Sequence, residues 1–180
     1  MSERIVLQRA TEARDSFGEP IKTWGNLAQV WAAVEWQSGS EAFQADREYA
    51  EVPVELRVRR STTTMSLREK DRALVASGVT EVKTTLGTST GTSLVVNTPG
   101  VFPPENEFCV RIGSELLLVA SGAGTVASPF VVSRGAYGTT ADTHMAGQSV
   151  IHMIPLDVVG VSKTKAMLNV TTVRGEVRTI

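Results

Sequence analysis

The clearest structural signal in the sequence is the run at residues 52–59, VPVELRVR. Val54, Leu56 and Val58 alternate with charged residues, and strict alternation over this length is typical of a strand with one buried face. Pro53 has no backbone N–H to donate, so we expect it near the start of the strand or on a sheet edge. The run therefore predicts a β-strand whose second face is solvated.

The segments around this run predict further strands. We expect them at residues 5–9, 24–36, 71–76, 156–161 and 166–173, with turn chemistry at residues 14–20 and a bulge or bend at Gly160. Residues 39–50 differ, because they contain good helix formers, Ser40 as an N-cap and an i,i+4 pair of Phe43 and Arg47. They predict either one short helix or a mobile loop.

Charge divides the chain into two compositional zones. The 180 residues carry 18 basic and 19 acidic side chains, yet residues 81–152 hold only eight of these charges and nine of the fifteen glycines. Such a shift within one chain suggests two modules. We therefore expect a discontinuous domain of residues 1–80 plus 153–180, interrupted by an inserted domain of residues 81–152.

Turn residues recur at hairpin spacing within the inserted segment. Short strands are expected at residues 92–96, 108–112, 116–120, 130–134 and 150–151. Gly113 and Ser114 provide a two-residue connection of the kind that closes a tight hairpin. The segment predicts a small antiparallel β module, and the chain as a whole is mainly β with at most one short helix.

Composition and motifs argue against several functional classes. A net charge of −1 lacks the basic excess of most nucleic-acid binders, and no apolar run reaches the about 18–20 residues of a membrane helix. The single cysteine, Cys109, forms no intramolecular disulfide or cysteine-based zinc site, and we expect it to be a small packed side chain. Neither a glycine-rich phosphate motif nor a serine nucleophile elbow is present in the sequence.

The two histidines give only weak evidence for a catalytic or metal-binding site. His144 and His152 lie eight residues apart, and we expect hydrogen-bonded or surface imidazoles rather than ligands or bases. An enzyme would depend on Asp142 and His144 alone. We therefore predict no enzymatic activity, no cofactor and no metal.

Two surface features each admit two interpretations. Arg57 and Arg59 share the solvated face of their strand, and Arg60 extends the patch. This patch is either a solvated face paired with Glu55 or a neighbouring strand, or a contact with another subunit or a phosphate backbone. The near-neutral net charge favours the first. Trp31, on the wetter face of its strand, is either packed on a partner strand or an exposed interface aromatic.

The charged flanks resemble the head-tail joining proteins of long-tailed bacteriophages. The resemblance is carried in order by residues 4–11 (RIVLQRAT), 14–20 (RDSFGEP), 23–24 (TW), 30–35 (VWAAVE), 38–41 (SGSE), 55–59 (ELRVR), 156–161 (LDVVGV) and 167–173. It covers about 105 residues, and the family's proteins are shorter than this chain, which assigns the excess to the insert. The resemblance implies that the flank domain is a small antiparallel β-barrel.

The same resemblance implies a structural role in the virion. Such proteins form a ring of six or twelve copies below the portal, either as an adaptor or as a stopper. The expected partners are the portal or its adaptor above, the tail terminator or tail tube below, and double-stranded DNA that passes without sequence-specific binding. The expected location is the virion neck, with the host cytoplasm during assembly and no membrane.

Residues 39–50 match the family's long loop, which implies contact with a partner. Phe43 and Tyr49 would be the anchors and Arg47 a charged contact; the alternative is a local helix that covers the barrel end. The full set of candidates for partner or ring contact is Phe43, Gln44, Arg47, Tyr49, Arg57, Arg59 and Trp31.

The insert resembles a small β module that recurs in phage virion proteins. Residues 108–115 (FCVRIGSE), 132–141 (VSRGAYGTTA) and 144–147 (HMAG) carry that resemblance, with Ser133 in place of the usual Thr. The module implies no particular activity. Its richness in Ser, Thr and Gly supports an alternative function, in which the insert is a surface-exposed adhesion or glycan-binding decoration.

Overall fold

The computed structural model describes residues 2–36, 53–87, 90–104, 107–163 and 167–174. The strands are β1 (Ser2–Arg14), β2 (Pro20–Trp36), β3 (Pro53–Arg59), β4 (Arg72–Glu81), β5 (Ser93–Leu94), β6 (Phe108–Ile112), β7 (Glu115–Ser121), β8 (Phe130–Ser133), β9 (Ser149–Lys163) and β10 (Met167–Arg174). Three 3₁₀ turns accompany them: η1 (Thr64–Ser66), η2 (Pro99–Val101) and η3 (Ala136–Gly138). These described ranges contain no α-helix, and the expected mainly β class is confirmed; the short helix or loop expected at residues 39–50 lies outside them.

The described strands form one ten-stranded antiparallel sheet, in the order β10-β3-β2-β1-β4-β9-β6-β7-β8-β5. Because β10 also pairs with β9, the first six strands of this order return on themselves as a ring. Closure of this kind removes exposed sheet edges. It gives the barrel-like arrangement expected for the flanks.

The 52–59 run behaves as its pattern predicts. Within β3, Val54, Leu56 and Val58 are fully buried, and Pro53 is the first residue of the strand. A central position between β2 and β10 is compatible with proline there, because the strand begins at that residue.

One long strand replaces two expected short ones at residues 149–163. Separate strands were expected at 150–151 and 156–161, but β9 is continuous through Pro155. Val150, His152, Ile154, Leu156 and Val158 are buried on both sides of the proline, so one face of the strand stays covered along this stretch. In the pairing with β10, the register skips Val159, so the bulge expected at Gly160 lies beside it.

The chain divides into two compact units. The first comprises Met1–Val75 and Pro155–Ile180, and the second comprises Ala76–Ile154. The first unit buries Ile5, Leu7, Leu56, Leu74, Leu156 and Leu168. The second has its own apolar cluster, which consists of Val82, Leu86, Leu94, Val96, Phe102, Phe108, Val110, Ile112, Leu117, Val119, Phe130, Val132 and Val150. Strands β4 and β9 contribute residues to both units.

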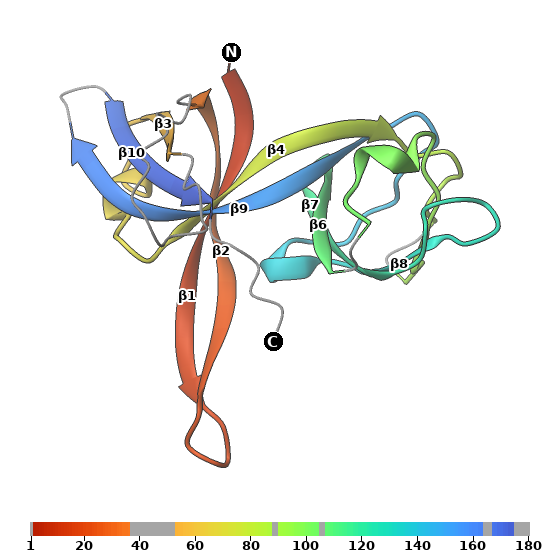
Figure 1. The fold of residues 1–180 in the computed structure, drawn as a ribbon, viewed down its shortest axis with the longest axis horizontal. Coiled ribbons are helices and arrows are strands. Elements are labelled where there is room, and N and C mark those ends of the chain that lie inside the picture. The colour runs from red at the N-terminus through yellow and green to blue at the C-terminus, as the bar shows by residue number, and fades with distance from the viewer. Residues whose placement is uncertain (1, 37–52, 88–89, 105–106, 164–166, 175–180) are drawn as a thin grey trace, which may run out of the picture. The chain divides into compact units, whose positions relative to one another are not determined.

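A two-stranded hairpin extends from the first unit (Figure 1). Strand β1 pairs with β4 only at residues 6–8, and β2 pairs with β3 only at residues 32–36. The pairing of β1 with β2 is longer and runs from Ser2 opposite Ala33 to Arg14 opposite Pro20. We call residues 9–26 the hairpin arm. Along this stretch β1 and β2 pair with each other and with no other described strand. Its turn is held by Asp15, whose carboxylate accepts hydrogen bonds from the N–H groups of Phe17 and Glu19.

Candidate functional site

Three of the candidate contact residues lie on one outer face of the first unit. In β3 the buried residues alternate with Glu55, Arg57 and Arg59, which point to the opposite face. The register pairs Arg57 with Ala33 of β2, and extension by one pair brings Trp31 opposite Arg59. We call Trp31, Arg57 and Arg59 the outer-face cluster. The other four candidates, Phe43, Gln44, Arg47 and Tyr49, lie outside the described residues.

Trp31 has 66% of its surface exposed to solvent, more than Trp36 of the same strand with 48%. Arg57 forms an ion pair with Glu35 on the neighbouring strand β2, which is one of the pairings considered for it. Both side chains are about half exposed, so solvent and salt screen the pair and its contribution to stability is small. The pair leaves the face polar around an exposed indole, an arrangement common in interfaces that are covered by a partner.

A second group of contacts fixes the base of the hairpin arm. The Arg9 guanidinium donates to both carboxylate oxygens of Asp71, from Nε at 2.9 Å and Nη2 at 2.8 Å, and also to the Ser66 carbonyl at 2.6 Å. The Asp71 side chain is only 4% exposed and also accepts from the Arg68 N–H. The two parallel hydrogen bonds fix the orientation of the guanidinium against the carboxylate and are stronger than bonds between neutral groups. The hydrogen bond to Asp71 also raises the pKa of Arg9.

Arg72 adds two more contacts at the same base. Its Nε donates to Gln8 Oε1 at 2.7 Å, and its guanidinium carbon lies 4.0 Å from the centre of the Trp24 ring. A guanidinium over an indole face is attracted by the ring quadrupole. The arm is therefore anchored where it leaves the unit.

In the second unit, two side chains and two backbone N–H groups converge on a buried carboxylate. Glu115 is fully buried and accepts from Arg134 Nε and Nη2 at 2.8 Å each, from the Gly135 N–H at 2.9 Å and from the Asp142 N–H at 3.0 Å. His144 Nε2 lies 2.7 Å from the same carboxylate. We call Glu115, Arg134 and His144 the carboxylate hub.

The hub has the electrostatics of a structural ion cluster. Burial by itself raises the pKa of Glu115, but the hydrogen bonds from Arg134, the Asp142 and Gly135 amides and His144 outweigh it and lower that pKa to about 2. Arg134 also donates to the carbonyls of Gly91 and Asp142, so one side chain ties the β4–β5 and β8–β9 connections to β7. The arrangement organises the loops of the module and leaves the carboxylate fully paired.

The hub explains the spaced motif that carries the insert's resemblance. Sequence reasoning paired His144 with Asp142, whereas its partner in the structure is Glu115, 29 residues away. A signal for this contact was nevertheless present, because Glu115, Arg134, Gly135 and His144 all lie in the three segments that carry the insert's resemblance. His152, as expected, is hydrogen-bonded too, with Nδ1 2.6 Å from Ser77 Oγ, and Cys109 is buried.

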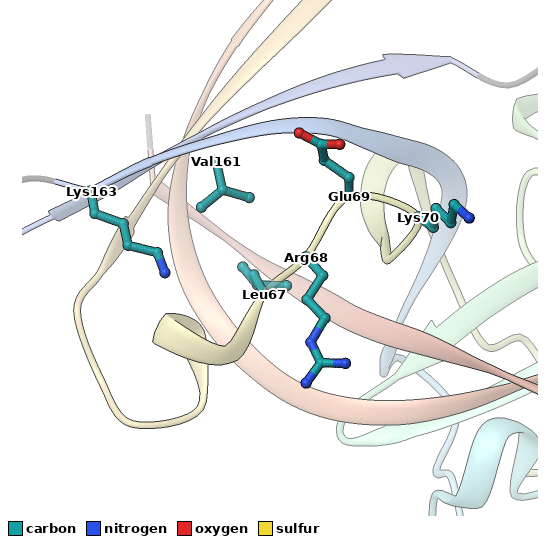
Figure 2. A pocket seen from close by; sticks show the side chains of 6 residues that line it. All are labelled: Leu67, Arg68, Glu69, Lys70, Val161 and Lys163. Atoms are coloured by element: carbon teal, nitrogen blue, oxygen red, sulfur yellow. The ribbon is translucent and has the colours of Figure 1, made fainter.

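A shallow hollow of about 420 Å³ lies on the first unit, lined by Leu67, Arg68, Glu69, Lys70, Val161 and Lys163 (Figure 2). Its charged side chains point in different directions, and Lys70 and Lys163 lie at opposite ends of it. Cations arranged in this way do not converge on one anion. The hollow therefore offers no built ligand site.

Neither a metal site nor a membrane-spanning helix is found in the part of the chain that the structure describes. No group of three or more His, Cys, Asp or Glu side chains there is placed to hold a metal ion. None of the described helical segments is long and apolar enough to cross a membrane.

Comparison with known proteins identifies the class of the N-terminal part. The model of the phage head completion protein family matches residues 1–87, which include β1, β2, β3 and β4. Residues 1–87 belong to the phage head completion protein family. No curated protein matches the chain. The match supports a structural, non-enzymatic role at head closure, in association with other virion proteins, for this part of the chain.

Proposed function

We propose that this head completion protein forms a ring in the phage neck. The ring, of six or twelve copies, docks between the portal or its adaptor and the tail terminator or tail tube, and it lines the channel through which DNA passes. The family match of residues 1–87 carries this proposal, since it assigns the chain to head closure.

The outer-face cluster supplies the contact surface in this proposal. Trp31 is 66% exposed, and the pairing register of β2 and β3 places it beside Arg59 on the same face. Tryptophan and arginine are enriched among the residues that dominate binding energy in interfaces. Coverage of this face by an adjacent copy would bury the indole and shield the Arg57–Glu35 pair from solvent.

Charge supports the role of a conduit. The chain has 18 basic and 19 acidic residues, so it lacks the cationic excess that holds DNA through its phosphates. A channel wall of balanced charge lets DNA slide past. The second unit, Ala76–Ile154, has its own core and would be an inserted module carried by the ring subunit.

Native mass spectrometry of necks purified from virions, or of connectors reconstituted with the portal, tests the proposal. Rings of six or twelve copies are expected. Trp31→Ala should reduce the ring yield at least several-fold, whereas Val126→Ala, which truncates a similarly exposed apolar residue of the second unit, should not. Assembled necks that contain only single copies of the chain would overturn the proposal.

A further inference from the structure

The hairpin arm has two open strand edges. Beyond Gln8, β1 pairs with no described strand except β2, and from Pro20 to Trp31 β2 pairs with no described strand except β1. A two-stranded ribbon buries little of its own surface and is marginally stable by itself. The arm nevertheless runs for several residue pairs beyond the contacts of Arg9 and Arg72 that anchor its base.

The hydrogen-bonding direction of each arm residue follows from the turn. The Asp15 N–H donates to the Glu19 carbonyl, so this pair faces inward across the hairpin. Because backbone groups alternate between the two sides of a strand, the N–H and C=O groups of Ala10, Glu12 and Arg14 point to the outer edge of β1. By the same alternation, those of Lys22 and Trp24 point to the outer edge of β2, and Pro20, which has no N–H, also falls there.

These two edges are complementary to each other. Within the hairpin, Glu12 is the partner of Lys22. If β1 of a neighbouring copy is placed beside β2 in the same antiparallel register, its Glu12 meets Lys22 as a hydrogen-bonded pair. The row across the sheet then alternates in charge, and opposite charges on facing residues stabilise a strand pair.

The position of the edges favours a second copy as the occupant. The open edges of β1 and β2 lie on opposite sides of the same hairpin, which is the requirement for a head-to-tail contact that repeats and closes into a ring. The arm also carries three basic and three acidic residues, so copies do not repel one another. A partner that added a single strand would use only one of the two edges.

We propose that neighbouring copies pair through their arms, with the β1 edge of one copy against the β2 edge of the next, Glu12 opposite Lys22. This contact rests on the proposed ring and specifies how its subunits join. It continues an antiparallel sheet from copy to copy and satisfies the outward backbone groups of both strands.

Mixed cysteine cross-linking tests the pairing in assembled necks. Particles are made with Glu12→Cys and Lys22→Cys chains together, and each variant is also assembled alone. A hydrogen-bonded antiparallel pair has Cα atoms about 5.5 Å apart, within the range of a disulfide. Covalent dimers are expected after oxidation only in the mixture. In particles of one variant each introduced cysteine faces Lys22 or Glu12 of the next copy, and the native Cys109 is buried.

The outcomes separate this contact from the ring itself. Wild-type necks without rings would overturn the proposed function and the arm pairing with it. If rings form but the mixture of the two cysteine variants gives no covalent dimers, the arm pairing alone is overturned. Dimers formed by Glu12→Cys alone would also overturn it, since they require two β1 edges to meet.

A backbone variant provides an independent test. Lys22→Pro removes an outward N–H and leaves the inward ladder of the hairpin intact, whereas Lys22→Ala changes only the side chain. We expect loss of rings for the proline variant and retained rings for the alanine variant, with circular dichroism to show that both fold. Rings at wild-type yield for a folded Lys22→Pro protein would contradict the proposal.

Discussion

At the scale of single residues, Glu115 is a carboxylate removed from solvent. Its carboxylate is fully buried and is compensated by Arg134, two backbone N–H groups and His144. A buried charge of this kind is tolerated only with such compensation, and removal of one partner leaves the others desolvated. The hub therefore makes the second unit sensitive to the protonation of one side chain.

Acid should destabilise the second unit through Glu115. The folded pKa of about 2 lies below the ordinary value of 4.5, so the stabilisation is complete above pH 4.5 and is lost as the pH falls through 2. A difference of this size corresponds to about 3 kcal/mol in the free energy of unfolding. Glu115→Gln should lower stability at pH 7 and remove this part of the pH dependence.

Urea denaturation followed by circular dichroism between pH 2 and pH 7 measures both effects. The matched control is Glu81→Gln, which removes an exposed carboxylate from the same unit and should leave the acid dependence unchanged. A Glu115→Gln protein with the full wild-type loss of stability in acid would contradict the role assigned to the hub.

At the scale of elements, the turn around η3 depends on one glycine. Gly135 has φ +60°, and a Cβ atom built there would lie 2.7 Å from the Thr139 carbonyl oxygen. The backbone conformation alone disfavours a side chain, and the contact leaves no space for one. Gly113, in the β6–β7 connection, has nearly the same φ of +59°, but nothing lies within 4 Å of its Cβ position.

This pair of glycines separates conformational strain from steric overlap. Gly113→Ala should cost about 1–2 kcal/mol, the penalty of the left-handed conformation. Gly135→Ala should cost clearly more, because the loop that brings Arg134 and the Gly135 N–H to Glu115 must shift as well. Thermal unfolding of the two variants checks the order, and equal losses would show that the turn relaxes freely.

At the scale of the whole molecule, the chain has two apolar cores with separate ionic clusters. Arg9 and Asp71 lie in the first unit, and Glu115 with its partners lies in the second. Distant substitutions without shared partners act additively. The two units should therefore respond to different mutations.

Hydrogen exchange with mass spectrometry measures that response segment by segment. Arg9→Ala leaves the buried Asp71 carboxylate without its guanidinium, so it should speed exchange in β1 and in residues 64–72. Glu115→Gln should speed exchange in β7 and η3 and leave the first unit at its wild-type rates. Equal acceleration of both units by either variant would show that the molecule unfolds as one.

The strands could be predicted from the sequence better than the contacts between them. Alternation predicted β3 and its buried face correctly, because a half-buried strand imposes a period of two on its own residues. The same local reasoning divided β9 at residues 152–155, since no local signal tells whether a strand continues from one unit into the next. The outer-face position of Trp31 beside Arg59 depends on the pairing register of β2 and β3, which are separated in the chain.

By itself, the sequence determined the β class, the compositional break and the head completion family of the first 87 residues. These features depend on side-chain periodicity and residue type, which are local properties of the chain. Only the tertiary structure decided that β10 closes the ring on β9, that Arg9 clamps Asp71 and that Glu115 receives Arg134 and His144. The residues of these contacts lie between five and 62 positions apart, so only the folded chain brings their charges and backbone groups within hydrogen-bonding distance.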